Sequence, residues 1–436
     1  MTETRPRRPR IADVAQVAGV SKASVSFAFN SPERLRAETA DRIRSVAAEL
    51  GYRPHPVARM LSARRTMTIG LLTPQSLSQV FANPFFAYFA EGVTSVTEER
   101  GFGLLLISPL RGSIARALDR ATVDGVVALG LDETYPEIEA IRHANVPMVL
   151  VDAPAWPEHS AVEVDDEGGA RAAAQHLVDL GHRRILVIAV EGPVAAEGLA
   201  AGEGLAAGEG RVAAERLTLG EAAAPEEDAA AARSSTVAAE PVTAAESADS
   251  GRRETLGHLG SAAPRESAAS ILSEGPQDGV MARRLRGYEA VLERAGIYLG
   301  PESVVVAPAA FEGGEAAFLR AWEDGLRPTA VLAMSDAIAI GVLQASRHLR
   351  LRVPRDLSIV GFDDLPVGRF SDPPLTTVHQ PVRRKGEEAA RLLLDELGAG
   401  AVAPAQHRVL QTRLVVRRST AAPPAADVRE EVAQAR

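Results

Sequence analysis

The chain contains no cysteine among its 436 residues, which excludes disulfide bonds and thiolate metal ligands. Its nine histidines are scattered and none shows H-E-x-x-H spacing, so we expect no metal. No apolar run approaches the roughly 18 to 20 residues that cross a bilayer. The basic start is followed by no apolar stretch typical of a secretory signal. We therefore expect a cytoplasmic protein with no cofactor and no membrane partner.

Lysine is almost absent as well, because Lys22 and Lys385 are the only two and all other cations are arginine. The charge is also unevenly distributed. The formal net charge is −9, but residues 1–65 carry thirteen basic and six acidic residues, a net charge of +7. The remainder of the chain therefore carries −16. A basic segment on an otherwise acidic chain indicates that the first 65 residues contact nucleic acid.

The basic segment has the pattern of three short helices between residues 10 and 51. Apolar residues at helical spacing predict a first helix that ends at Gly19. Ser21 is a suitable N-cap for a second helix, and a third is expected over residues 37–50. Two helices joined by so short a turn predict an all-α helix-turn-helix DNA-binding domain.

The second helix is expected to bury Val25, Ala28 and Phe29 and to present its other face to DNA. That face would carry Lys22, Ala23, Ser26 and Phe27. An aromatic ring can contact a thymine methyl group but donates no hydrogen bond. Phe27 therefore either contacts bases in this way or folds back to shield the domain.

Beyond residue 68, short apolar strands alternate with amphipathic helices, which predicts doubly wound parallel sheets with ligands at the carboxyl ends of the strands. Residues 191–278 interrupt this rhythm. They contain no aromatic residue, carry sixteen acidic and six basic residues, and repeat "LAAGEG" in tandem. This composition predicts a largely disordered acidic insertion. It either competes weakly with DNA phosphates or binds a partner, or it is a tolerated surface insertion.

Nine segments, in order, resemble the lactose-repressor (LacI/GalR) family of bacterial transcription regulators. They are "IADVAQVAGVSKASVS", "ELGYRPHPVARML", "NPFFAYFAEGV", "VDGVVAL", "HLVDLGHRRILVI", "RLRGYEAVLERAG", "SDAIAIGVL", "VPRDLSIVGFDDLP" and "PPLTTVHQP". The resemblance implies a homodimer that binds a near-palindromic operator. It further implies a two-lobed core, like that of periplasmic binding proteins, that holds a small-molecule effector such as a carbohydrate.

The resemblance also sets the expected domain boundaries. They are 1–56 for the helix-turn-helix domain, 57–66 for a hinge helix, 67–420 for the core, 191–278 for the insertion and 421–436 for a tail. Within the core, the first lobe is expected at about 67–165 and 379–406, and the second at about 166–378 and 407–420.

By motif position, Lys22, Ala23 and Phe27 match the base-contacting positions of the family, although arginine is common at the third. Leu61 matches a leucine that enters the minor groove, with Ala58 beside it, but it could also be plain linker. The predicted DNA-binding residues are Ser21, Lys22, Ala23, Ser26, Phe27, Asn30, Ala58 and Leu61.

A sugar-like effector needs carboxylates and an arginine for its hydroxyls and aromatic rings for its apolar face. The predicted effector-binding residues are Asn83, Phe85, Phe86, Asp152, Arg284, Asp336, Asp363 and Phe370. For some of these a structural role is the alternative: the two adjacent phenylalanines could be ordinary core, and Asp336 could cap a helix.

Two other functions fit the same fold. A sugar-binding protein without regulatory DNA binding would not need the basic helix-turn-helix. An enzyme is not expected, because the chain lacks G-x-S-x-G, a Walker A loop and a strand-linked G-x-G-x-x-G. The expected function is thus an effector-controlled transcriptional regulator, with repression as the expected mode.

Overall fold

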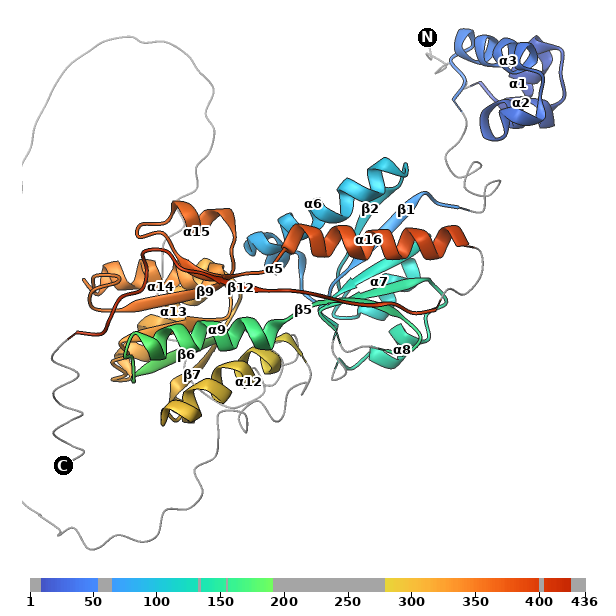
Figure 1. Cartoon of the computed structure of the whole chain (residues 1–436). Coiled ribbons are helices and arrows are strands. Elements are labelled where there is room, and N and C mark those ends of the chain that lie inside the picture. Colours follow the sequence, from blue (N-terminus) through green and yellow to red (C-terminus); the bar gives the residue numbers. More distant parts are fainter. Residues whose placement is uncertain are drawn as a thin grey trace, which may run out of the picture. The chain divides into compact units, whose positions relative to one another are not determined.

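The structure is a computed structural model, shown in Figure 1, and it describes residues 9–53, 65–131, 135–153, 156–190, 279–399 and 404–424. Three predictions fall partly or wholly outside these residues. They concern the hinge helix with Ala58 and Leu61, the insertion at 191–278, and the tail beyond residue 424.

Three helices form the N-terminal domain, as the sequence predicts. The elements are α1 (Ile11–Ala18), α2 (Lys22–Asn30), a 3-10 turn η1 (Pro32–Arg34) and α3 (Ala37–Glu49). Gly19 ends α1 with a φ of 65°, a conformation that glycine adopts without strain. Ser21 then caps α2, its side chain accepting a hydrogen bond from the Ser24 amide at 3.0 Å.

Small and aliphatic side chains fill the space between these helices. The buried residues are Val14, Ala15, Ala18, Val25, Ala28, Ile43 and Ala47. The Phe29 ring packs against this core, 6.0 Å from the ring of Tyr52. One face of α2 is therefore committed to packing, which leaves the opposite face available for contacts outside the domain.

The first lobe is built on a sheet of six parallel strands. Their spatial order is β11 (His407–Leu410), β5 (Ser160–Val164), β4 (Met148–Val151), β3 (Gly125–Leu129), β1 (Thr68–Leu72) and β2 (Gly103–Ile107). After β1 the chain adds β2 on one side and then β3, β4 and β5 on the other side. This is the doubly wound arrangement that the alternation of strands and helices predicts.

The second lobe repeats this plan. Its strands are ordered β12 (Arg413–Val415), β10 (Thr376–His379), β9 (Ser358–Asp363), β8 (Ala330–Ala333), β6 (Ile185–Val190) and β7 (Val304–Ala307). All neighbouring pairs are parallel except β10 and β12, which are antiparallel. This edge strand is the one departure from the purely parallel sheets expected from sequence.

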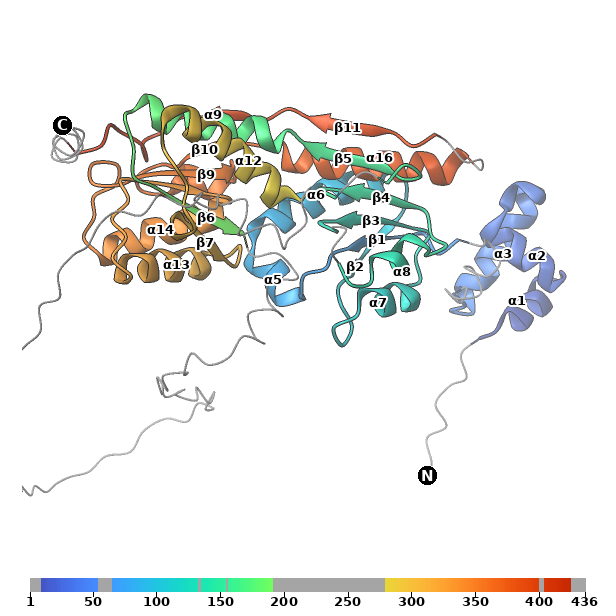
Figure 2. The same ribbon diagram turned by 90° about the horizontal axis from the view of Figure 1, so that it is seen from below.

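Helices cover both faces of each sheet, as Figures 1 and 2 show. In the first lobe α6 (Pro84–Glu99) and α16 (Val382–Ala399) pack on one face, and α7 (Ile114–Arg120) and α8 (Ile138–Arg142) on the other. In the second lobe the pairs are α9 (Asp166–Asp179) with α12 (Val280–Leu292), and α13 (Phe311–Glu323) with α14 (Asp336–His348). Burial on both faces explains why the strands are continuous apolar runs.

The chain passes between the lobes three times, after β5, after β10 and after β11. Since β11 pairs with β5, the last passage lies between Leu410 and Arg413 and not at the 406/407 boundary expected from sequence.

Among the described residues, none of the helices has the length and apolar character needed to span a membrane. No group of three or more histidine or acidic side chains in these residues is placed to hold a metal ion.

Candidate functional site

A cavity of about 440 Å³ lies where the carboxyl ends of strands from both sheets meet. The last residues of β3, β6 and β9 and the residues that follow β3, β4, β7, β8 and β10 contribute to its lining, together with α12, α6 and the preceding short helix α5 (Leu77–Ala82). This is the place where doubly wound sheets bind ligands, because side chains and free backbone groups converge there.

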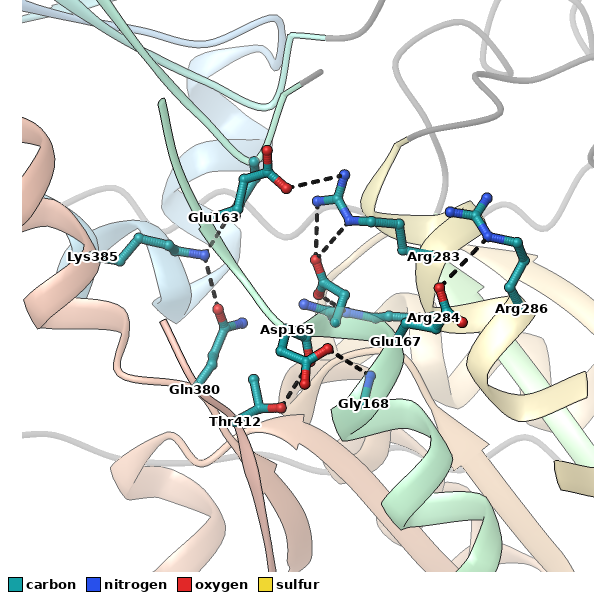
Figure 3. Close-up of polar contacts among 12 residues, drawn as sticks. Glu163, Asp165, Glu167, Gly168, Arg283, Arg284, Arg286, Gln380, Lys385 and Thr412 are labelled. Atoms are coloured by element: carbon teal, nitrogen blue, oxygen red, sulfur yellow. Dashed lines mark hydrogen bonds and ion pairs between the residues drawn. The ribbon is translucent and has the colours of Figure 1, made fainter. Parts of the chain in front are cut away.

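In the second lobe, the cavity is bordered by a buried ion pair. The Arg284 Nε donates to Asp166 Oδ1 at 2.8 Å, while another guanidinium nitrogen donates to the carbonyl of Met334. Arg283 donates to Asp166 Oδ2 at 3.0 and 3.2 Å. Figure 3 shows both arginines extending from α12. The Arg284 guanidinium also lies over the Phe362 ring, 3.6 Å from its centroid, so its position is fixed on several sides.

In the first lobe, the corresponding ion pair joins Lys385 on α16 to Asp152 after β4. The Lys385 side chain is 0% exposed, and its Nζ donates to Asp152 Oδ2 at 2.5 Å. Asp152 Oδ1 is buried without a hydrogen-bond partner, although the residue lines the cavity. A buried carboxylate oxygen with no partner is costly. A ligand hydroxyl that donates to it would remove this cost.

Gln380, which follows β10, links the two lobes through its amide. Its Oε1 accepts from Lys385 Nζ at 2.8 Å, and its Nε2 donates to Asp363 Oδ1. Figure 3 shows the lysine amine directed at this amide. The ammonium on one side and the carboxylate on the other determine the orientation of the amide, since the reverse orientation would oppose like charges.

Asp363 is the second carboxylate that lines the cavity. Burial raises its pKa to about 6, although Arg284, Gln380 and Lys385 favour the ionised form. Both Asp152 and Asp363 have positive φ angles, 53° and 119°, which non-glycine residues rarely adopt. Strained backbone at two cavity carboxylates is a frequent property of binding sites.

Part of the lining, close to the Lys385–Asp152 pair, is aromatic. The rings of Phe85 and Phe86 meet edge to face with centroids 5.8 Å apart, and Phe85 also stacks on Phe89. Asn83 accepts a hydrogen bond from the Phe85 amide at 3.1 Å and so caps α6. The cavity thus combines an apolar wall with carboxylate acceptors and a fixed guanidinium, an arrangement suited to a polyhydroxylated ligand.

The exposed face of α2 is the second candidate site. Lys22 and Ala23 are exposed, and Ser26 and Phe27 are half-buried on the side away from the domain core. Asn30 donates to the Ser26 hydroxyl at 3.3 Å near the end of the helix. The arrangement matches the helix face predicted to contact DNA.

Three family models match the chain in succession. The model described as "Bacterial regulatory proteins, lacI family" matches residues 10–55. "Periplasmic binding proteins and sugar binding domain of LacI family" matches residues 66–202, and "Periplasmic binding protein-like domain" matches residues 257–420.

The chain belongs to the lacI family of bacterial regulatory proteins.

Relatives match this lacI-family chain over nearly its whole length. "HTH-type transcriptional regulator CelR" of Thermobifida fusca is 29% identical, over 95% of this chain and 99% of the relative. "Ribose operon repressor" of Escherichia coli strain K12 is 28% identical, over 94% and 98%. With this family membership the chain is a DNA-binding transcriptional regulator, as the sequence predicted.

Solved structures agree with the fold. The structure described as "transcriptional regulator CelR-cellobiose complex" has a TM-score of 0.56 at 27% identity, covering 94% of this chain and 100% of the other. A lac repressor dimer bound to operator and the anti-inducer ONPF has a TM-score of 0.65 at 22% identity, covering 95% and 100%. Both confirm the helix-turn-helix and two-lobed architecture of this lacI-family chain.

The structure brings together six of the eight residues predicted for effector binding in this regulator. Those that line the cavity are Asn83, Phe85, Phe86, Asp152, Arg284 and Asp363. Asp336 lies outside the lining, because its carboxylate accepts hydrogen bonds from Thr377 and the Leu365 amide, at 2.5 and 2.6 Å. Phe370, at the end of α15 (Pro366–Phe370), is 88% exposed and also lies outside.

Asp336 is not the N-cap of α14 either. Ser335 takes that role, accepting from the Ile338 amide at 3.2 Å, and Ser335 lines the cavity. Sequence reasoning missed Lys385, Gln380 and Asp166. One signal was available: Lys385 is one of two lysines among 48 basic residues, and a rare lysine in an arginine-rich chain marks a position that arginine does not fill.

Proposed function

We propose that this chain is a cytoplasmic, homodimeric repressor whose affinity for a near-palindromic operator is controlled by a neutral sugar bound between its lobes. The role is one of binding and switching, with no catalytic step. The observation that carries the proposal is the combination, in one lacI-family chain, of a helix-turn-helix with a free helix face and a cavity with a buried, unpartnered acceptor at Asp152 Oδ1.

The chemistry of the cavity supports a neutral polyol. The charges at its border nearly balance: Lys385 pairs with Asp152, Arg284 pairs with Asp166, and Asp363 is influenced by both cations. A charged ligand would therefore meet a nearly compensated site, whereas hydroxyl groups find acceptors at Asp152 and Asp363 and donors at Arg284. The family model names a sugar-binding domain, and solved relatives hold cellobiose and ribose.

A ligand in the cavity can act on DNA binding through the polar contacts that join the lobes. Gln380 bonds to groups of both lobes, and the Arg283 guanidinium lies 4.0 Å from Glu163 on β5. A ligand that bonds to both lobes stabilises one relative arrangement, and operator affinity changes by the same coupling free energy. The proposed effector set is Asn83, Phe85, Phe86, Asp152, Arg284, Asp363, Gln380 and Ser335.

The test begins with DNA. Selection of sites from a random duplex pool by the full-length protein, at physiological salt, is expected to yield a palindrome. The selected duplex is then titrated with cellobiose, ribose and other neutral mono- and disaccharides. At least one is expected to change operator affinity. A palindrome without a response to any sugar would reject the effector class, and sugar binding without a selected site would favour a sugar-binding protein without regulatory DNA binding.

Asp152→Asn sharpens the assignment of the cavity. The change keeps the shape but removes a charged acceptor, so sugar affinity should fall about tenfold or more. Asp119→Asn, at an exposed position on α7 of the same lobe, is the matched control. Equal sugar affinity in the two variants would place the sugar elsewhere.

A further inference from the structure

The ring of Phe27, on the exposed face of α2, lies close to the side chain of Arg34. The guanidinium carbon of Arg34, in the turn η1, lies 5.4 Å from the centroid of the Phe27 ring. This is within the range of cation–π interactions. Arginine is common at the position of Phe27 in the family. In this chain a guanidinium is still found at this face, but it comes from Arg34, seven positions later.

The backbone between the two residues explains why they meet. The Ser31 amide donates to the Phe27 carbonyl at 2.9 Å, and the Arg34 amide donates to the Ser31 carbonyl at 3.0 Å. Pro32 occupies the first turn of η1, where its fixed φ is favourable. Leu35 packs against the domain core just after the turn. The chain therefore turns back at the end of α2 and places residue 34 beside residue 27.

The guanidinium of Arg34 remains available for DNA. Within residues 9–53 no ion pair or side-chain hydrogen bond involves Arg34, and the residue is exposed. Arg44 shows the contrast, because it donates to the Ala28 carbonyl at the end of α2 and pairs with Asp41. A guanidinium that stacks by its face keeps its N–H donors in the plane of the group, directed away from the ring.

Phe27 faces away from the buried residues Val25 and Ala28, on the same side of α2 as Lys22 and Ala23. The Arg34 guanidinium next to this ring is therefore at the face of α2 that would enter the major groove. A guanidinium there can donate two hydrogen bonds to O6 and N7 of guanine, whereas the ring itself can contact only a methyl group or an apolar base edge.

We infer that Phe27 and Arg34 act as one composite base-contacting unit, in which the ring holds the guanidinium in place to recognise a guanine of each operator half-site. The inference rests on the proposed operator binding. Phe27 is the positioning residue and Arg34 supplies the donors. Because the ring restricts the side chain before DNA arrives, less conformational entropy is lost when the bonds to guanine form.

The test compares selected sites. Full-length wild type, Arg34→Ala, Phe27→Leu, the double variant of these two changes, Phe27→Tyr and Arg36→Ala each select sites from the same random duplex pool. Affinities are then measured for the wild-type palindrome and for its single-base variants. Arg36 is a suitable control, since it is exposed, lies two residues from Arg34 and has no cation–π contact within residues 9–53. Circular dichroism checks that each variant keeps its helices.

We expect Arg34→Ala to reduce discrimination for guanine at one base pair per half-site by about tenfold or more. Phe27→Leu should reduce discrimination at the same base pair, and the double variant should lose little beyond either single change, because the two residues act together. Phe27→Tyr, which keeps the ring face, should retain the preference. Arg36→Ala should leave it unchanged.

A uniform loss of affinity over all sequences in Arg34→Ala, with a salt dependence weaker by about one phosphate contact, would make Arg34 a phosphate ligand and overturn the inference. Effects of Phe27→Leu and Arg34→Ala at different base pairs would overturn it as well. In both cases the wild-type palindrome would still support the proposed function. If the wild type selects no palindrome, the proposed operator binding itself fails and the inference fails with it.

Discussion

The two lobes each bury one ion pair beside the cavity, and the pairs differ in how completely the carboxylate is satisfied. In the second lobe Asp166 is 0% exposed and both of its oxygens accept hydrogen bonds from arginines of α12. In the first lobe the Asp152 side chain is 9% exposed, and only one of its oxygens has a partner, Lys385.

The difference in hydrogen bonding suits Asp166 to a structural role and Asp152 to the proposed binding of a ligand. A buried carboxylate whose two oxygens both accept from guanidinium groups has no unpartnered oxygen left, and it joins α9 to α12. A carboxylate that is held by a single point charge keeps its second oxygen for a ligand. Lysine suits the latter role because it makes one compact contact, where an arginine would take both oxygens.

The largest loss of stability is expected when the ion pairs of Asp166 with Arg283 and Arg284 are broken. Asp166→Leu leaves two arginines beside an apolar residue and should lower the free energy of unfolding by about 3 to 5 kcal/mol. The chain has two tryptophans, Trp156 in the first lobe and Trp322 in the second, so fluorine NMR of 5-fluorotryptophan protein in urea reports each lobe separately. The Trp322 signal should show the earlier transition.

Glu167→Ala is the matched control for this change. Glu167 is the next residue of α9 and pairs with Arg171 and Arg286, both of which are partly exposed. Its loss should cost no more than about 1 kcal/mol. Similar urea transitions for the Asp166 and Glu167 variants would mean that burial adds nothing to the Asp166 pair.

Breaking the Lys385–Asp152 pair should lower stability somewhat less, and only in the first lobe. Lys385→Met leaves Asp152 buried without its counter-ion and should cost about 3 kcal/mol, seen at the Trp156 signal. Adding Asp152→Leu removes the stranded charge, so the double variant should recover most of the loss. If the double variant is as unstable as Lys385→Met, the lysine stabilises the lobe through its contact with Phe85, 4.9 Å away, and not through the ion pair.

The proposed sugar-binding role of the cavity carboxylates predicts that sugar affinity depends on pH. Burial raises the pKa of Asp363 to about 6, and the ionised form is the better acceptor for hydroxyl groups. Sugar affinity should therefore be full above pH 7 and fall about tenfold by pH 5, as the group takes up a proton. Calorimetric titration over this range should show a flat profile for Asp363→Asn. A wild-type profile that is flat as well would remove Asp363 from the binding set.

The smallest effect concerns a histidine buried in the second lobe. His182 has hydrogen-bond partners in Thr329, Ser358 and the Ala421 carbonyl, and burial lowers its pKa. The neutral form is thus favoured in the folded state. The stability that it contributes is present above the unfolded pKa of about 6.5 and is lost as pH falls through the lower folded value, by at most about 1.4 kcal/mol per pH unit.

His182→Gln should flatten this acid dependence in urea titrations that follow the Trp322 signal. His348→Gln, at an exposed position in the same lobe, is the control and should keep the wild-type slope. An unchanged slope in His182→Gln would assign the acid sensitivity of the second lobe to other groups.

Local patterns were sufficient to predict much of this architecture. The three N-terminal helices follow from apolar spacing, Gly19 and the Ser21 cap, all of which act within a few residues. Among the twelve strands that the structure describes, seven coincide to within one residue with short apolar runs of the sequence, namely "TIGLLTP", "FGLLLIS", "DGVVAL", "VPMVLVD", "RRILVIA", "AVLAMSD" and "LSIVGFDD". The strands that were not identified are β5, β7, β10, β11 and β12, and three of them, β7, β11 and β12, are edge strands whose side chains are only partly buried.

The cavity was predicted less completely, for a reason that individual residues illustrate. Asp152 and Asp363 could be selected because carboxyl ends of parallel strands converge, a rule that needs no coordinates. Asp336 follows a strand in the same way, yet Thr377 and Leu365 take up its oxygens. Whether a polar group faces a ligand or a neighbouring loop depends on partners far away in the sequence.

The sequence by itself determined the basic helix-turn-helix, the doubly wound lobes and the family, because these depend on local spacing, composition and motif order. Only the tertiary structure decided which carboxylate keeps a free oxygen. That choice required Lys385 to reach Asp152, which is 233 residues away in the sequence, and Arg283 and Arg284 to enclose Asp166. Hydrogen bonds between distant segments are set by packing, and no local pattern encodes them.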